Sequence, residues 1–359
     1  MSTSITIDDG IVYSFRKLKV SRCRTRVVAN VYDPKNQIIP GRGNLYPLIV
    51  NLPYIALEAK REYDQLQTHD TTFEEYFIGK LDRYQDECFD LLIDKLNYIS
   101  RKKAKNFPFL MGNHLYVGSE HFTPESEIGP AIRNGTLTTG FIGLAECLVV
   151  LTGKHHGESD AAQELGLSII KHMYDRCVAK SQEMQLNFTL MGAPAEGAAG
   201  RLLRCTRKEF GIIPGVTDHE FLTNSHHIPV YYKISFIDKV LKEAPYHKYE
   251  PAGGISYIEL SSDTAQNVEA FQQMVEFMAD NDMGYFSINH PVDRDPVCGY
   301  TGIIPLGGTC PRCGRKENEG VAASKLLSLT TYSPDPEYAI PYDTVDVRDE
   351  TLTNDIETH

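Results

Sequence analysis

The sequence predicts an α/β fold in which strands and helices alternate along the chain. Short apolar runs that suit buried strands occur at 46–52, 186–191, 255–260 and 284–289. Longer stretches with helical spacing of apolar residues lie between them, at 72–100, 159–183 and 264–279. This alternation is typical of a sheet built from crossover units, whose functional loops lie at the carboxyl ends of the strands.

The first elements predicted along the chain are two strands joined through a turn. The segment 26–32 is β-branched and follows an arginine-rich stretch, and 46–52 is nearly continuous in apolar residues, as a buried strand is. The cluster Pro40-Gly41-Arg42-Gly43 predicts a turn between them, because glycine permits positive φ and proline ends strand pairing.

A long helix beginning after Thr72 is the clearest local prediction. Thr72 and Glu75 form a capping-box pattern, and the cations of 101–103 suit the negative end of the helix dipole. Cys88 lies close to the apolar stripe, so we expect it in the core. The stripe consists of Phe73, Phe77, Leu81, Tyr84, Phe89, Leu92 and Leu96.

Two more helices and two histidine pairs follow. The helix at 159–183 should turn Leu165, Ile169, Ile170, Met173 and Val178 inward, with Cys177 as a packing residue. The helix at 264–279 should bury Val268, Phe271, Val275 and Met278. We expect His155 and His156 to be solvated on a loop. His226 and His227 precede a strand, where they are either satisfied core residues or contacts to a substrate.

Composition limits the possible classes of protein. The 359 residues are 42% apolar, enough for a substantial core, and the net charge of −12 argues against a nucleic-acid or acidic-membrane surface. The chain has no apolar run of about 18 residues and no apolar signal segment after Met1, so we expect a soluble cytoplasmic protein. Eight cysteines in a chain of this length fit a reducing compartment.

Cys23 is the first candidate for chemistry. It lies among Arg22, Arg24 and Arg26. Cationic neighbours lower the pKa of a thiol and attract anionic ligands, so this thiol suits a reaction on a negatively charged substrate. The alternative is a cysteine at a strand edge among solvated arginines.

A second candidate is a metal knuckle near the C-terminus. Cys310 and Cys313 form a Cys-x-x-Cys hook, and the first hook reads Asp295-x-x-Cys298. Two such hooks predict zinc bound by Cys298, Cys310 and Cys313. The fourth ligand is Asp295, His290 or water. The alternative, a redox dithiol of Cys310 and Cys313, lacks the βαβ context that a thioredoxin-like site has.

Several blocks of the sequence resemble one enzyme family. These are Cys23-Arg24-Thr25-Arg26-Val27, Gly41-Arg42-Gly43-Asn44, the Gly-Phe-Ile-Gly-Leu-Ala-Glu run at 140–146, the Ala-Pro-Ala-Glu-Gly run at 193–197, and the blocks 208–215 and 223–230. They are similar to the anaerobic, glycyl-radical ribonucleoside-triphosphate reductases.

The resemblance implies roles for three residues. Cys23 would become the thiyl radical that abstracts the ribose 3′-hydrogen, and Asn44 would hold the substrate hydroxyls. Glu196 would assist the thiyl chemistry, as a glutamate does in the branch of the family that uses a dithiol reductant. The alternative for Glu196 is a glutamate that stabilises a helix N-terminus.

The resemblance also implies an organisation. Residues 1–289 would be part of a glycyl-radical-enzyme type α/β barrel with its finger loop around 21–44, followed by a zinc-binding and degenerate radical-loop region at 290–332 and a disordered tail at 333–359. In the family a separate radical-SAM activase supplies the radical, ATP and deoxynucleotides regulate through an N-terminal region, and the enzyme is a homodimer. A separate N-terminal or glycine-radical subunit is a further expected partner.

One departure from the family is chemical. Family members store the radical on a glycine in an Arg-x-x-Gly-Tyr segment, where this chain reads Ser328-Leu329-Thr330-Thr331-Tyr332. Thr331 therefore replaces that glycine. Two hypotheses remain: a catalytic part of an anaerobic reductase that acts on ribonucleoside triphosphates, or a non-catalytic zinc-binding relative that acts as a regulatory or partner subunit.

Overall fold

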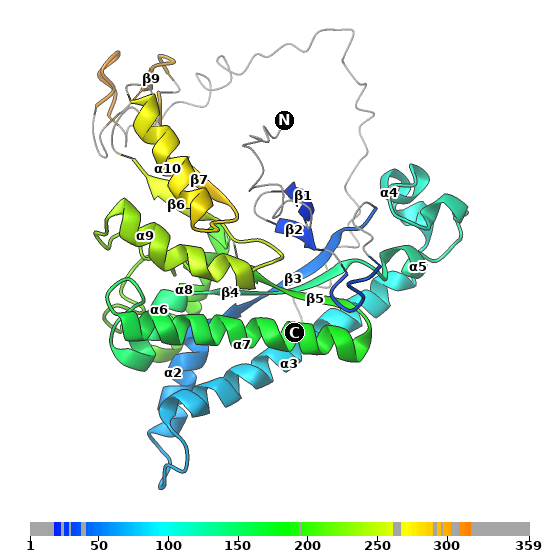
Figure 1. Ribbon diagram of the computed structural model, residues 1–359, viewed down its shortest axis with the longest axis horizontal. Coiled ribbons are helices and arrows are strands. Elements are labelled where there is room, and N and C mark those ends of the chain that lie inside the picture. Colours follow the sequence, from blue (N-terminus) through cyan, green and yellow to red (C-terminus); the bar gives the residue numbers. More distant parts are fainter. Residues whose placement is uncertain are drawn as a thin grey trace. The chain divides into compact units, whose positions relative to one another are not determined.

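Figure 1 shows the computed structural model of the chain. The structure describes residues 18–22, 25–28, 30–36, 41–193, 195–260, 267–289, 293–295, 297–302, 304 and 309–316. The chain divides into two compact units between Asn289 and His290, and each unit is described by itself. The positions of Cys23, His290, Thr331 and the tail predicted at 333–359 lie outside the described residues.

A three-stranded parallel sheet forms the centre of the first unit. Its strands are β3 (Asn44–Asn51), β4 (Thr136–Ile142) and β5 (Asn187–Gly192), in the order β3-β4-β5. Every residue of β4 and β5 is buried, as in parallel sheets covered on both faces, whereas Val50 alone is buried in β3. The parallel arrangement places the carboxyl ends of all three strands at one edge of the sheet.

Two long helices lie along one side of this sheet (Figure 1): α3 (Phe73–Ser100) and α7 (Asp160–Met184). The ring of Phe89 in α3 meets that of Phe188 in β5 edge-on, with centroids 5.2 Å apart. The capping box predicted at Thr72 and Glu75 is formed. Cys177 is buried, as predicted, together with Ile169, Ile170 and Met173, but Leu165 and Val178 are only partly buried.

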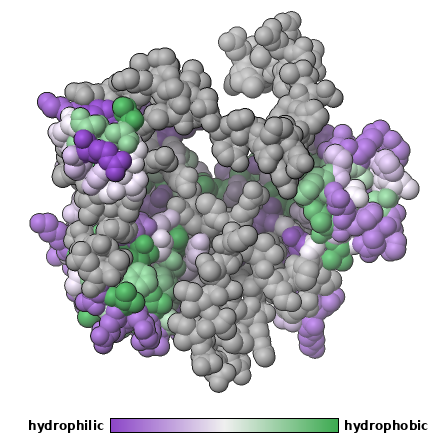
Figure 2. All heavy atoms as spheres, turned by 90° about the horizontal axis from the view of Figure 1, so that it is seen from above, coloured by the Kyte–Doolittle hydropathy of each residue, from purple (hydrophilic) through white to green (hydrophobic). Residues whose placement is uncertain are grey.

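Shorter helices complete the first unit. They are α2 (Leu52–Tyr63), α4 (Pro108–Gly112), α5 (Gly129–Ile132), α6 (Leu144–Thr152), α8 (Glu196–Phe210) and α9 (Phe236–Glu243), with 3₁₀ turns η1 (Ala104–Asn106), η2 (Ser119–His121) and η3 (Ala244–Tyr249). Phe109, Leu115 and Val117 are exposed around α4. Figure 2 shows hydrophobic patches among hydrophilic ones at its right, where Figure 1 places α4.

Two smaller sheets belong to the same unit. Strands β1 (Leu18–Arg22) and β2 (Thr25–Val28) are antiparallel, and β6 (Ser256–Glu259) is parallel to β7 (Phe286–Asn289), with α10 (Val268–Asp280) between them. The strand predicted over 26–32 was too long, because β2 ends at Val28. The predicted inward face of α10 was also wrong in part: Val268 is 66% exposed and Phe271 37% exposed, while Met278 is buried.

The second unit is described over short segments. Strands β8 (Asp293–Arg294) and β9 (Thr301–Gly302) pair antiparallel, and Thr309 bridges Lys316. Taken together, the two units form a mixed α/β protein with parallel sheets; the barrel stays a prediction. Across the part of the chain that the structure describes, no helix has the length and apolar character needed to span a membrane.

Candidate active site and metal cluster

The segment that follows Cys23 is anchored through Arg26. The Arg26 backbone N–H donates to the Ala252 carbonyl at 2.6 Å, and its Nη2 donates to the Gly284 carbonyl at 2.7 Å. Arg26 is only 8% exposed, and burial lowers the pKa of its guanidinium. The alternative of solvated arginines is thus wrong for Arg26, which joins β2 to Ala252 through its backbone and to Gly284 through its side chain.

Asn44 is the predicted substrate residue that the structure describes in full. It begins β3, and its Nδ2 donates to the Arg26 carbonyl at 3.1 Å. Its Oδ1 is buried and has no hydrogen-bond partner among the described residues. Leaving an amide oxygen unsatisfied costs free energy, so this atom is suited to a ligand hydroxyl.

The turn before Asn44 requires glycine at one position. Gly41 has φ +69°, and a Cβ there would lie 2.6 Å from Val117 Cγ2 and 2.7 Å from its backbone nitrogen. Glycine alone adopts this conformation without steric cost and leaves room for the neighbouring chain. Of the turn predicted at 40–43, residues 41–43 are described, and they lead directly to Asn44 at the start of β3.

Glu196 lies at the first residue of α8, directly after β5. The turn predicted over 192–201 was too long, because the helix already begins at this residue. This position fits the alternative given for Glu196, in which the glutamate stabilises a helix N-terminus through the helix dipole. The proton-transfer role of Glu196 stays a prediction, since its side chain is outside the described residues.

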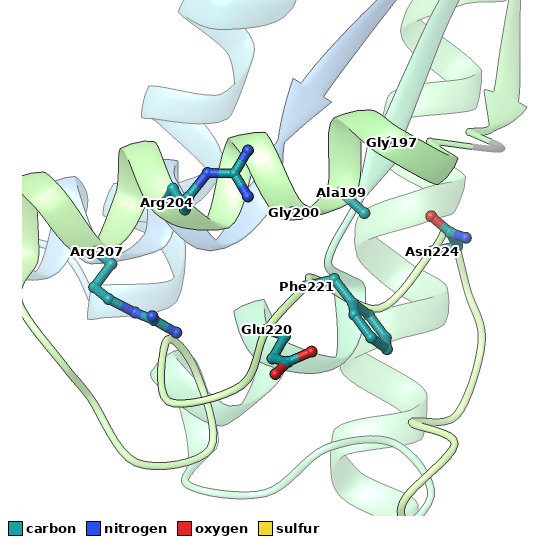
Figure 3. Close-up of a pocket in the computed structure, with 8 residues that line it drawn as sticks. All are labelled: Gly197, Ala199, Gly200, Arg204, Arg207, Glu220, Phe221 and Asn224. Atoms are coloured by element: carbon teal, nitrogen blue, oxygen red, sulfur yellow. The ribbon is translucent and has the colours of Figure 1, made fainter. Parts of the chain in front are cut away.

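An open hollow of about 650 Å³ lies beside α8. Figure 3 shows Glu220, Phe221 and Asn224 on a segment that faces the helix. Arg207 is held there, with its Nε donating to the Thr217 carbonyl at 2.7 Å, whereas Arg204 is exposed at the hollow. The lining residues are Gly197, Ala199, Gly200, Arg204, Arg207, Glu220, Phe221 and Asn224.

Glu146, which the sequence analysis did not single out, fixes the facing segment. Its Oε1 accepts hydrogen bonds from the Thr223 backbone N–H at 2.8 Å and from Thr223 Oγ1 at 2.7 Å. Gly143 N–H donates to the Thr223 carbonyl at 2.9 Å, and Ile142 bridges Asn224. The sequence did contain a signal for this residue, because Glu146 is the only carboxylate of the glycine-containing block at 140–146 and is its last residue.

The histidine pairs are buried. His155 is 4% exposed and His156 is fully buried, so the prediction that both are solvated was wrong. His156 Nε2 lies 2.9 Å from the His226 carbonyl and His227 Nε2 lies 2.5 Å from the Ile255 carbonyl. Burial lowers the pKa of His156 and of His226 to about 3, so both imidazoles are neutral near neutral pH.

Asp295, Cys298, Cys310 and Cys313 form a cluster in the second unit that could hold a metal ion. One potential ligand atom from each lies within 4.8 Å of the others, and Cys298 Sγ is 3.6 Å from Cys310 Sγ. Asp295 is buried; its Oδ1 accepts from the backbone N–H groups of Val297 (2.7 Å) and Cys298 (3.1 Å).

The other carboxylate oxygen of Asp295 faces the thiols. Its Oδ2 accepts from Arg315 Nε at 2.9 Å and lies 3.5 Å from Cys313 Sγ. Three sulfurs and one carboxylate oxygen thus converge, as metal ligands do. The cluster contains the three cysteines of the predicted site together with Asp295, one of the alternatives for the fourth ligand.

Comparisons with known proteins show which family this chain resembles. A family model described as anaerobic ribonucleoside-triphosphate reductase matches residues 10–325. The reductase of Haemophilus influenzae is 29% identical over 320 residues, which are 87% of this chain and 43% of that protein. That of Enterobacteria phage T4 is 29% identical over 287 residues, which are 79% of this chain and 44% of that protein.

Solved structures show the same fold. An anaerobic ribonucleotide reductase matches with a TM-score of 0.58 at 20% identity, over 77% of this chain and 39% of that chain. The Thermotoga maritima reductase with glycerol in the active site matches with a TM-score of 0.57 at 20% identity, over 77% of this chain and 40% of that chain. The chain spans less than half the length of these relatives. Since the family model covers most of the chain, the protein belongs to the anaerobic ribonucleoside-triphosphate reductase family.

Proposed function

We propose that this chain supplies the thiyl-cysteine part of a reductase that converts ribonucleoside triphosphates to 2′-deoxyribonucleoside triphosphates without oxygen. The observation that carries the proposal is the family match over residues 10–325, which includes Cys23, Asn44 and Glu196. The open Oδ1 of Asn44 supports it, because it provides a buried acceptor beside the segment that follows Cys23.

Each candidate residue has a role in this reaction. Cys23, as a thiyl radical, abstracts the ribose 3′-hydrogen, Asn44 Oδ1 accepts a ribose hydroxyl, and Glu196 assists the thiyl chemistry. The hollow beside α8 suits an anionic group, since it is lined by the first helical turn at Gly197 and by the exposed guanidinium of Arg204. Gly197 and Gly200 leave that surface open to a close ligand.

The reaction needs more than these residues. The chain spans about 43% of its relatives' length, so we propose the activity for this sequence together with the remaining family sequence, on the same polypeptide or on a separate subunit. A radical-SAM activase supplies the radical, the assembly is a homodimer, and ATP and deoxynucleotides regulate through the remaining sequence.

We also propose that the metal of the second unit is zinc, bound by Cys298, Cys310 and Cys313. Asp295 is the fourth ligand, because its Oδ2 already faces the thiols and its Oδ1 is held by two backbone N–H groups. When bound, zinc supplies a tetrahedral crosslink between the two hooks and takes no part in the radical reaction. Arg315 keeps the carboxylate oriented through Oδ2.

A non-catalytic role is the second candidate, and one observation favours it. The family match ends at residue 325, before Thr331, the position that the resemblance assigns to the radical glycine. A side chain disfavours the planar geometry of a glycyl-type radical, and a β-branched residue stiffens the loop. A chain that had lost radical storage in this way would act as a regulatory or partner subunit.

Electron paramagnetic resonance distinguishes the two functions. Incubated anaerobically with a radical-SAM activase, the chain alone should give no glycyl-type doublet and no turnover of nucleotide. Adding a glycine-bearing C-terminal peptide or partner from the family should restore both, and Cys23→Ser should abolish turnover but leave the doublet. If the added peptide or partner also restores nucleotide turnover in the Cys23→Ser variant, the proposed function is contradicted. A doublet from the chain alone shows that another glycine, such as Gly320, stores the radical.

A further inference from the structure

Four buried side chains form a continuous chain of hydrogen bonds in the first unit. His226 Nδ1 lies 2.7 Å from Glu250 Oε1, and His226 Nε2 lies 3.2 Å from Ser256 Oγ. His247 Nε2 lies 3.0 Å from the same Ser256 oxygen. Glu250, His226 and Ser256 are fully buried and His247 is 6% exposed, so three short steps link a carboxyl group to an imidazole away from water.

The carboxyl end of this chain lies against the end of β5. A Cβ at Gly192, the last residue of β5, would lie 2.6 Å from Glu250 Oε2, and a Cβ at Gly254 would lie 1.7 Å from it. Glycine at both positions leaves the space that the carboxyl group occupies. Arg26 lies close enough for the two charges to influence each other's pKa, so the acid end faces the strand that follows Cys23.

The direction of the hydrogen bonds follows from which groups carry protons. Burial raises the pKa of Glu250 well above its usual range and lowers that of His247 well below, so burial favours the protonated carboxyl and the neutral imidazole. Glu250 Oε2 has no partner among the described residues. If the proton were on Oε2, the buried O–H group there would have no acceptor. If the proton is on Oε1, it is donated to His226 and Oε2 is left as an unpaired acceptor. An unpaired buried acceptor costs less free energy than an unpaired buried donor, so we place the proton on Oε1.

The three hydrogen bonds then all point in the same direction, from Glu250 toward His247. Glu250 Oε1–H donates to His226 Nδ1, His226 Nε2–H donates to Ser256 Oγ, and Ser256 O–H donates to His247 Nε2. His247 therefore carries its own proton on Nδ1. Each of the three hydrogen bonds along the path then has one donor and one acceptor, which stabilises a buried polar chain.

We infer that Glu250, His226, Ser256 and His247 form a proton relay whose acid end lies at the carboxyl end of β5. In one transfer the Glu250 proton moves to His226 Nδ1, the His226 Nε2 proton moves to Ser256 Oγ, and the Ser256 proton moves to His247 Nε2. The products are a Glu250 carboxylate, stabilised by Arg26, and a cationic His247. The reverse transfer restores the neutral acid.

The surroundings bias this equilibrium. The titratable and charged groups that face the relay are Arg26, His156, His227, Lys239, Glu243 and Tyr246. Arg26 favours the Glu250 carboxylate but disfavours a cationic His247, and Glu243 disfavours the carboxylate. The relay itself is a property of these side chains; its use as a proton source for the departing ribose 2′-hydroxyl rests on the proposed function.

Nitrogen-15 NMR of the full chain with labelled histidine tests the relay without requiring activity. His156 and His227 provide internal references, because their Nε2 atoms face backbone carbonyls, which only accept, and so must be protonated. We expect His226 protonated on Nε2 as well, and His247 protonated on Nδ1. If His247 of the wild-type chain carries its proton on Nε2, the proposed direction of the hydrogen bonds is wrong.

Two variants separate a relay from static hydrogen bonds. Ser256→Ala removes the donor to His247 and should move the His247 Nε2 resonance, whereas Ser287→Ala on the neighbouring strand β7 should not. Glu250→Gln keeps a donor to His226 Nδ1 but cannot give up a proton. In this variant the His226 Nδ1 resonance should have the chemical shift of an unprotonated ring nitrogen. In the wild-type chain, proton transfer should average this shift between the unprotonated and the protonated values, and the average should change with temperature. Identical wild-type and Glu250→Gln resonances refute proton transfer.

The end of β5 offers a steric test of the same arrangement. Gly192→Ala places a methyl group against Glu250 Oε2 and should break the bond to His226, which the His226 shift reports. Gly79→Ala in α3 meets no atom within 4 Å and is the matched control. An unchanged His226 spectrum in Gly192→Ala contradicts the placement of the acid end. Neither result depends on ribonucleotide reduction, so failure of the relay and failure of the proposed function are distinguishable.

Discussion

Asn44 is the residue whose geometry bears most directly on ligand binding. Asn44→Ala removes the unpaired Oδ1 and should weaken binding of a ribonucleoside triphosphate about tenfold, or ~1.4 kcal/mol, the value of one hydrogen bond to a ligand. Isothermal titration calorimetry measures this. The proposed function has this atom accept a ribose hydroxyl; where that hydroxyl is the 2′ one, the preference for a ribonucleotide over its 2′-deoxy counterpart should shrink in the same variant.

A matched control exists for this measurement. Asn113 is an exposed asparagine whose Nδ2 also donates to a backbone carbonyl, that of Phe109 at 2.8 Å. Asn113→Ala should leave nucleotide affinity at the wild-type value. Equal affinities for Asn44→Ala and Asn113→Ala would remove Asn44 from the binding site.

At the residue scale, the sequence predicts a side chain's environment when its partners are near in the chain. The spacing of Asp295 to Cys298 and of Cys310 to Cys313 already places two ligand pairs, and the structure brings them together. His156 has its partner at His226, 70 residues away, and His226 pairs with Glu250. No local spacing carries that information, which is why the burial of His155 and His156 and the relay were not predicted.

At the scale of elements, α3 depends on its N-terminal cap. Thr72 Oγ1 accepts from the Glu75 N–H at 3.2 Å, and the Glu75 carboxylate accepts from the Thr72 N–H at 2.8 Å. Thr72→Ala should lower the free energy of unfolding by about 1 kcal/mol, measured by urea denaturation. Thr71→Ala is the control, since the hydrogen bond described for Thr71 uses its backbone carbonyl, which accepts from Tyr63. Equal midpoints in the two variants would show that the cap contributes nothing.

Local signals of this strength are not present in every element. In helix α8 the first residue, Glu196, is followed by Gly197, Ala198, Ala199 and Gly200, and glycine has low helix propensity, so the sequence favours a turn. The helix forms because Ala199 and Leu203 pack with Ile142 and Leu222. In α10 the helical spacing was correct, but Val268 and Phe271 find no core to contact among the described residues, since only the second half of the helix packs.

At the scale of the molecule, alternation of strands and helices predicted the α/β class, and the parallel order β3-β4-β5 agrees with it. Strand order was not predictable, because apolar runs specify that a strand is buried and not which strand lies beside it. The carboxyl ends of β4 and β5 lead to Glu146, α8 and the acid end of the relay. Asn44 instead lies at the opposite end, where β3 begins.

The two compact units should respond differently to loss of metal. The first unit has a core of its own, including Phe77, Phe89, Phe141 and Phe188. The second is described only as short strands and turns around the cysteine cluster, so the free energy of metal binding should be what folds it. Chelation should therefore abolish hydrogen-exchange protection in 293–316 and leave the sheet of β3, β4 and β5 protected.

Metal analysis and ligand variants complete this prediction. Protein purified without added zinc should contain about one zinc per chain, as expected of one tetrahedral site. Asp295→Ala should weaken zinc binding because it removes the oxygen that faces Cys313, whereas His290→Ala should retain wild-type affinity. Substitution with cobalt reports the ligands by absorption, and Asp295→Cys should shift the spectrum toward four sulfurs. Well-folded protein with almost no zinc would contradict the metal site itself, and an Asp295→Ala variant with unchanged affinity and cobalt spectrum would contradict only the fourth ligand.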